Sequence, residues 1–153
     1  MTFKATFNIN LEAKARKASE QAAKAVFAEL NGRFQDAIGS KAWPWPDRTT
    51  YRSGGPITGG PRNIVDSSNL KGSNPGPKIN GLEVEFRWSA PYATATHEGA
   101  VIYPYGDRSR TPVILPMRPW TAAVLGTIPY QGIPVYDLRR RFAAVWMAKF
   151  KAG

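Results

Sequence analysis

The stretch Leu82–Gly99, LEVEFRWSAPYATATHEG, decides the fold. Its first half, Leu82–Trp88, alternates apolar and charged side chains, which is the period of a strand with one buried face. That alternation predicts a half-buried strand of an antiparallel sheet, whose large apolar side chains each contribute about 1.5–3 kcal/mol when fully buried. Pro91 ends the strand, and Tyr92–Gly99 is predicted to be the turn that leaves the sheet.

A long helix is predicted before this strand. Apolar side chains recur at three- and four-residue steps from Leu11 to Ile38, with Asn10 as the N-cap and Gly39 as the C-terminal stop. Such a helix would run about 40 Å, roughly the diameter of a domain of this size. Two interpretations follow: an ordinary core helix for most of its length, or a helix of which part packs outside its own domain. Thr2–Asn8 alternates and predicts an edge strand or an arm.

Residues 40–77 have a different composition, rich in Gly, Pro, Ser, Asn, Thr and Arg, which predicts a long, flexible loop region. Trp43 and Trp45 in this region have two interpretations: a binding loop, or a lid that folds back on the core. A short turn of helix is predicted within the loop, with Asp66 as its cap and Leu70 as its anchor.

The C-terminal half predicts a hairpin and two more helices. Residues 101–105 and 111–115 flank a polar, basic tip at 106–110, and their prolines are typical of edge strands. Residues 118–125 predict a short helix, and Tyr136–Lys149 predicts a helix with one apolar stripe. The fold class is therefore α+β, with a long N-terminal helix and a C-terminal helix packed on an antiparallel sheet.

Composition sets the limits on function. The 153 residues, 42% of them hydrophobic, are expected to form one domain spanning 1–153. The chain has no cysteine and one histidine, so no metal site and no thiol redox chemistry is expected. We find no signal-like or membrane-spanning stretch and expect a soluble, non-secreted protein with no membrane partner. The net charge of +10 allows nucleic acid or an acidic protein as a partner.

No catalytic motif is present in the sequence. The GGP segments at 54–56 and 59–61 lack the Lys-Ser/Thr pair of a phosphate-binding loop. His97-Glu98, close to Tyr92, is the one candidate acid–base pair, and it has no accompanying nucleophile or metal ligands. We therefore predict that the chain is not an enzyme and uses no cofactor.

A basic nucleic-acid-binding accessory protein is the alternative function. Arginines and aromatic residues occur together in the C-terminal half, as on surfaces that combine phosphate contacts with stacking. The same residues also fit the solvated face and the apolar stripe of ordinary helices. The residues concerned are Arg108, Arg110, Arg118, Arg139, Arg140 and Arg141, with Tyr103, Tyr105, Trp120 and Trp146.

Four short motifs occur in the order found in a known family. Asp66–Ser73 is followed by the strand Leu82–Trp88, then by Tyr92-Ala93 with Glu98-Gly99, and last by Arg118-Pro119-Trp120. This order resembles the tail-completion or head–tail joining proteins of long-tailed bacteriophages, small neck proteins also described as minor tail components. The motif and interface candidates are Asp66, Leu70, Ser73, Tyr92, Glu98, Gly99, Arg118, Pro119, Trp120, Trp43 and Trp45.

The resemblance implies a structural virion protein without catalysis or cofactor. Such a protein forms a homo-oligomeric ring, sixfold or twelvefold, between the head connector or stopper and the tail tube, with a channel for DNA. It would be assembled in the bacterial cytoplasm and be found in the virion neck. A ring needs heterologous interfaces, which exposed sheet edges or loops that order on contact can supply.

Overall fold

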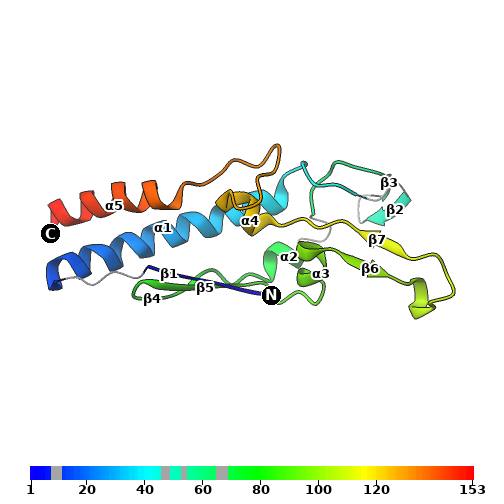
Figure 1. Ribbon diagram of the computed structural model, residues 1–153, viewed down its shortest axis with the longest axis horizontal. Helices are drawn as coiled ribbons and strands as arrows, with labels where there is room; N and C mark the ends of the chain where they lie inside the picture. Colours follow the sequence, from blue (N-terminus) through cyan, green and yellow to red (C-terminus); the bar gives the residue numbers. More distant parts are fainter. Residues whose placement is uncertain (8–11, 46–48, 53–54, 65–68) are drawn as a thin grey trace.

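The computed structural model describes the whole chain except residues 8–11, 46–48, 53–54 and 65–68. It is elongated and contains both helices and antiparallel strands, which confirms the α+β class (Figure 1). The elements are β1 (Thr2–Thr6), α1 (Ala13–Gly39), β2 (Thr49–Arg52), β3 (Gly55–Thr58), α2 (Asn69–Gly72), β4 (Lys78–Asn80), β5 (Glu83–Arg87), α3 (Ala93–Glu98), β6 (Ala100–Ile102), the 3-10 turn η1 (Pro104–Gly106), β7 (Val113–Leu115), α4 (Trp120–Leu125) and α5 (Leu138–Ala152).

The main sheet has three antiparallel strands in the order β1-β5-β4. The predicted central strand is β5, and its inner residues Val84 and Phe86 are buried, as is Trp88 directly after it. Phe3 of β1 pairs with Phe86, so the apolar side chains form a row across the sheet. The predicted N-terminal edge strand is confirmed as β1. The sequence did not predict β4, which pairs with the other edge of β5.

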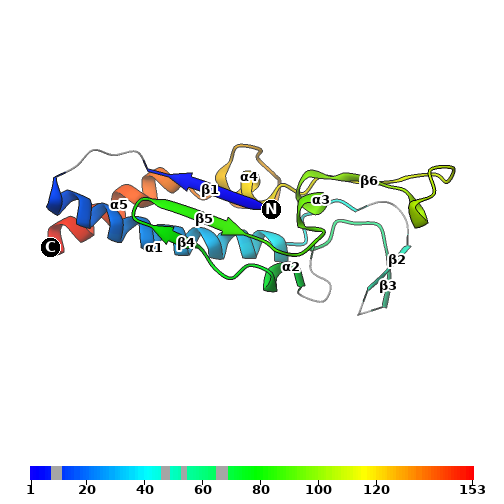
Figure 2. The ribbon, with the colours of Figure 1, turned by 90° about the horizontal axis from the view of Figure 1, so that it is seen from below.

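Helix α1 lies between this sheet and helix α5 (Figures 1 and 2). Phe34 of α1 meets Phe86 edge-on with ring centroids 5.1 Å apart, and it also contacts Trp88. These contacts bury the face of α1 that the apolar spacing predicted. For the positions from Ala18 to Ile38 that are buried, the interpretation as an ordinary core helix is confirmed.

Helix α5 packs on α1, and its contact with the sheet side is made through Phe142 and Phe7, whose ring centroids are 4.2 Å apart. Trp146 donates from Nε1 to Ser19 Oγ at 2.9 Å, which fixes α5 beside the N-terminal half of α1. Helix α1 thus packs on other elements of its own chain. One side of the helix packs on the sheet, and another packs on α5.

The helix boundaries differ from prediction by one or two residues at several ends. α1 begins at Ala13, after Glu12 at its N-cap position, and the predicted start Leu11 and predicted N-cap Asn10 lie outside the described residues. Gly39 is the last helical residue and not a left-handed stop, because Ser40 caps the helix in an extended conformation. α5 begins at Leu138, where the carboxylate of Asp137 accepts a hydrogen bond from the backbone of Arg140.

The region 40–77 contains a hairpin that the sequence did not predict, formed by the antiparallel strands β2 and β3. The short helix predicted within this region is α2. The stretch TTYRSGGPIT at 49–58 contains adjacent glycines between residues of high strand propensity, a hairpin signal in the sequence that the loop prediction overlooked. Leu70 is buried, as expected of an anchor, and the predicted cap Asp66 lies outside the described residues.

The segment after β5 is also different from its prediction. Tyr92–Gly99 was expected to be a turn, and the structure has the helix α3, with Tyr92 at its N-cap position and Gly99 at its C-cap position. The predicted hairpin follows as β6 and β7, and the predicted short helix is α4, ended by the left-handed Gly126. Of these elements, the hairpin lies farthest from the helical layer (Figure 1).

Candidate assembly arm

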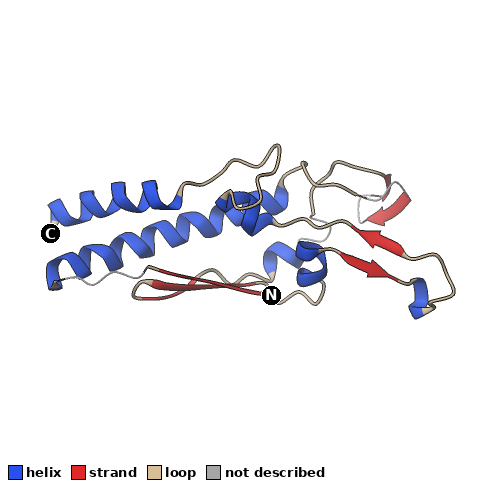
Figure 3. Cartoon of the chain, in the orientation of Figure 1, coloured by secondary structure: helices blue, strands red, loops and turns tan. Residues whose placement is uncertain are grey.

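The β6–β7 hairpin, together with the tip that joins its strands, forms an arm at residues 100–115 that projects from the molecule (Figure 3). Its two strands pair with each other through Ala100↔Leu115, Val101↔Ile114 and Ile102↔Val113. Within the described residues, neither strand has a second neighbour. A two-stranded hairpin of this kind is marginally stable alone in water.

The arm exposes apolar side chains that core strands would bury. Val101 is 56% exposed and Ile114, its partner across the hairpin, is 69% exposed. Ile102 and Tyr103 are exposed as well. Single exposed apolar residues are normal on a protein surface, whereas a contiguous group on a projecting element marks an interaction site.

The tip of the arm is held by local contacts. Tyr105 has a left-handed backbone, φ 56°, and its side chain is 94% exposed. The guanidinium of Arg110 lies 5.2 Å from the centre of the Tyr105 ring and forms an ion pair with Asp107. Asp107 also accepts hydrogen bonds from the backbone and the hydroxyl of Ser109. These contacts present an aromatic ring and two arginines, Arg108 and Arg110, to solvent.

Gly99 sets the close approach of the two chain segments at the base of the arm. Its φ of 81° favours glycine, and a Cβ atom there would lie 2.9 Å from the Leu115 carbonyl oxygen and 3.0 Å from the Met117 nitrogen. Any other residue would therefore push β6 away from the strand that returns. The motif glycine is a requirement of the arm's geometry.

Arg118 and Trp45 join the arm to the rest of the chain. The backbone N–H of Arg118 donates to the His97 carbonyl at 3.1 Å, and its Nε donates to the Pro44 carbonyl at 3.0 Å. The Trp45 ring contacts two guanidinium groups, those of Arg118 and Arg62, each 4.1 Å from its centre. Both arginines are buried, where such cation–π contacts are strongest.

His97 completes the base of the arm. Its ring meets Trp120 edge-on with centroids 4.6 Å apart, and its Nε2 lies 2.8 Å from Thr121 Oγ1. Burial lowers the pKa of His97 below its ordinary value, and the Glu98 carboxylate opposes this effect. Trp120 in turn contacts Trp88, so a line of aromatic rings connects the main sheet to the arm.

Several of the sequence-predicted site residues support the base of the arm from inside. Arg118, Pro119 and Trp120 are buried and therefore do not themselves form an exposed interface. Ser73 joins the end of α2 to the segment after β5, because its carbonyl accepts a hydrogen bond from the Ser89 backbone at 3.2 Å. Of the candidates, Tyr92 and Glu98 are exposed, and both belong to α3 or its cap.

Trp43 is a lid on the core and not part of a binding loop. It is fully buried, its Nε1 donates to the Ala37 carbonyl, and its ring packs 4.7 Å from Tyr130. The interpretation of Trp43 as a binding residue is therefore wrong. Trp45 is half-buried and contacts two arginines, so it also has a structural role, at the base of the arm.

The basic and aromatic residues of the nucleic-acid hypothesis do not form one surface. Arg118 and Trp120 are buried, Arg108 and Arg110 lie at the arm tip, and residues 139–141 begin helix α5. The sequence pattern therefore combined residues from three separate places in the structure. Of these, only the start of α5 belongs to a larger group of cations.

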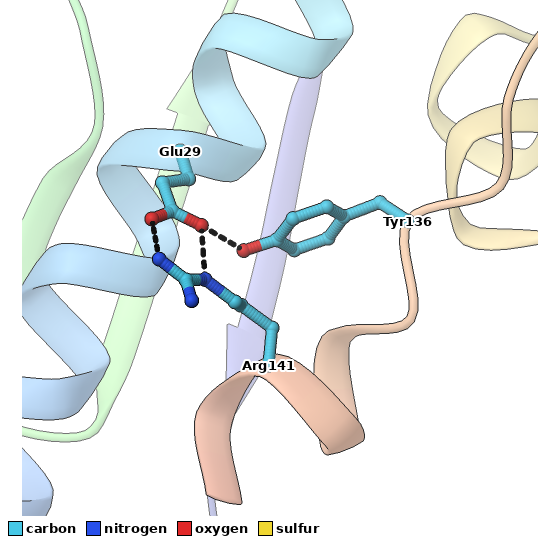
Figure 4. A network of polar contacts seen from close by, with 3 residues as sticks. All are labelled: Glu29, Tyr136 and Arg141. Atoms are coloured by element: carbon cyan, nitrogen blue, oxygen red, sulfur yellow. Dashed lines mark hydrogen bonds and ion pairs between the residues drawn. The ribbon is translucent and has the colours of Figure 1, made fainter. Parts of the chain in front are cut away.

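A polar network that the sequence did not predict fastens α5 to α1. Glu29 accepts two hydrogen bonds from the Arg141 guanidinium, at 2.6 and 2.8 Å, and one from the Tyr136 hydroxyl at 2.8 Å (Figure 4). The Arg141 contact is the main cause that lowers the pKa of Glu29 to about 2, and burial raises the pKa of Tyr136. Glu29 is more than a hundred positions from both Tyr136 and Arg141, so no local pattern indicated their contact.

Neither a metal site nor a membrane span occurs in the part of the chain that the structure describes. These residues contain no group of three or more His, Asp or Glu side chains placed to hold a metal ion. No helix among them has both the length and the hydrophobicity needed to cross a membrane.

No family model, curated protein or solved structure matches the chain. The family expected from the motifs stays a prediction.

Proposed function

We propose that the chain is a structural protein of a tailed-phage virion that forms a ring in the neck and joins the tail to the head connector. The observation that carries the proposal is the arm, an apolar hairpin held away from the molecule with its Val101–Ile114 pair exposed. A surface of this kind gains stability when a partner covers it. The motif order that resembles neck proteins supports the choice of partner class.

A neighbouring copy of the chain is the first partner. In a closed ring each subunit uses one patch to contact a different patch on the next subunit. An arm that leaves the molecule at one end suits such a heterologous contact, since it reaches past its own subunit. The connector or stopper and the tail tube are the further partners, and a central channel passes DNA.

The chain has no catalytic role in this proposal. His97, in the only acid–base pair that the sequence offered, packs on Trp120 and hydrogen-bonds to Thr121. In this proposal that side chain supports the base of the arm. The protein would be assembled in the bacterial cytoplasm and then remain in the virion.

Removal of the gene from the phage that encodes the chain tests this function. We expect the chain in purified virions, and we expect a deletion to give DNA-filled heads and separate tails that join when the purified protein is added. Joined, infectious particles in the absence of the gene would overturn the proposal. So would virions that lack the chain.

A further inference from the structure

A second surface, at the opposite end of the elongated molecule from the arm, is defined by charge (Figure 1). Every charged residue of α5 is a cation, and all of them are exposed: Arg139, Arg140, Arg141, Lys149 and Lys151. Arg141 is paired with Glu29. The other four make no ion pair with any described residue, so their charge is directed to solvent.

Helix α1 adds cations beside α5. Lys14, Lys17 and Lys149 together line a hollow of about 280 Å³ between the ends of the two helices. A second hollow of about 410 Å³ lies nearer the start of α5, lined by Arg33, Arg140 and Arg141 among others. The contacts of Trp146 with Ser19 and of Lys14 with the Phe150 ring hold the two helices side by side here.

The charge of the chain is concentrated in this pair of helices. Residues 12–39 and 136–153 contain ten Lys and Arg side chains and five Asp and Glu side chains. Their net charge of +5 is half of the +10 of the whole chain. On α5, Arg140 and Lys151 are eleven residues apart, which at 3.6 residues per turn brings them to the same side of the helix, about 16.5 Å apart along its axis. A single ligand that contacts both must therefore carry anionic charge repeated along its length.

We infer that the layer formed by α1 and α5 binds the phosphate backbone of duplex DNA without reading its base sequence. Duplex DNA carries one negative charge per about 1.7 Å of its axis, so it meets widely spaced cations at any register. Lysine and arginine on an exposed helical face supply phosphate contacts, which position a protein on DNA but do not specify sequence. The inference rests on charge and does not depend on the assembly of a ring.

The test uses the full chain and a duplex of arbitrary sequence, with binding measured over a series of salt concentrations. One variant changes Arg139, Arg140, Lys149 and Lys151 to Gln. The matched control changes Lys41, Lys78, Arg87 and Arg108 to Gln, which removes the same two Arg and two Lys charges from exposed positions elsewhere. Circular dichroism of both variants verifies that the fold is kept.

We expect the wild type to bind duplex DNA with an affinity that falls steeply with salt. The α5 variant should bind at least about tenfold more weakly at low salt, and its salt slope should be shallower by roughly 0.9 for each phosphate that it no longer neutralises. The control variant should retain most of the affinity. Equal weakening in the two variants, or no retention of wild-type protein on DNA at low salt, would overturn the inference.

An acidic polypeptide is the competing ligand class. If polyglutamate of matched charge binds the wild type as tightly as duplex DNA at the same salt, the surface serves an acidic protein and the DNA inference fails. An arm variant, Val101→Asp with Ile114→Asp, should still bind DNA. Loss of DNA binding in the α5 variant with self-association intact separates this inference from the proposed assembly.

Discussion

Two antiparallel sheets in the same chain have opposite surroundings. The main sheet packs its inner face on α1, and Val84 and Phe86 of β5 are almost completely buried. The arm has strands of similar residue types, yet Val101 and Ile114 are more than half exposed. The main sheet is completed by its own chain, whereas the arm lacks a cover among the described residues.

The difference shows which part of the molecule is available to a partner. Burying a large apolar side chain contributes about 1.5–3 kcal/mol, so the main sheet has already gained this energy on folding. The arm can gain it only by association. Its base is held firmly by Gly99, Arg118 and Trp120, which keeps the arm extended instead of letting it fold back on the helices.

The same charged substitution should have opposite effects in the two sheets. Phe86→Asp places an unpaired carboxylate in the core and should cost more than about 4 kcal/mol, enough to prevent folding. Ile114→Asp should change the free energy of unfolding by no more than about 0.5 kcal/mol. Urea unfolding measures both. Cooperative unfolding of the Phe86 variant would show that the inner face of the sheet is misassigned. An Ile114 variant that no longer folds would show that the arm belongs to the core.

Gly99→Ala should weaken the base of the arm. Its Cβ would meet the backbone of Leu115 and Met117 in a left-handed conformation, at a cost of about 1–3 kcal/mol. Gly76→Ala is the matched control, because Gly76 also has a positive φ but its Cβ would touch nothing within 4 Å. The thermal midpoint should fall further for the Gly99 variant. Equal shifts would mean that the close approach at the arm base carries no cost.

The base of the arm should also respond to pH through His97. Its pKa is lowered in the folded state by burial, so the unfolded chain binds a proton that the folded chain resists. Stability should therefore decline as the pH falls through the ordinary histidine value of 6.5. His97→Asn should flatten this part of the pH profile, measured as the thermal midpoint against pH. Parallel profiles for the two proteins would contradict a buried, neutral imidazole.

A smaller effect is expected at the contact of α5 with α1. The pKa of Glu29 is lowered to about 2 from 4.5 by the hydrogen bonds from Arg141 and Tyr136. The stability that this carboxylate provides is complete above pH 4.5 and should be lost as the pH falls from there toward 2. Because the pair is partly exposed, we expect about 1 kcal/mol or less. Glu29→Gln should remove this contribution to the loss of stability at acid pH, measured as the free energy of unfolding against pH. An unchanged loss in the variant would mean that other carboxylates cause it.

The sequence predicted the elements that have long, regular patterns. Helices α1 and α5 and strand β5 carry enough periodic apolar residues to be recognised by themselves. Strand β4 has three residues and helix α3 has six, and both exist because of what they pair with or pack against. Local propensity is too weak to reveal such elements.

The candidate site was only partly accessible to prediction. The hairpin was expected, and the motif residues near it were identified, but Arg118, Trp120 and Trp43 turned out to be buried supports. The exposed residues that distinguish the arm, Val101 and Ile114, belong to residue types that are usually buried. Exposure depends on tertiary arrangement, so the sequence alone did not distinguish the arm from a core hairpin.

The mass of the protein in solution tests the central claim, that the arm is an assembly surface. We compare the wild type, the arm variant Val101→Asp with Ile114→Asp, and a control, Ile128→Asp with Val135→Asp, which alters two exposed apolar residues outside the arm. Sedimentation velocity should give oligomers for the wild type and the control as concentration rises, and the 16.8 kDa monomer for the arm variant. A wild type that stays monomeric throughout, or an arm variant that assembles like the wild type, would contradict this claim.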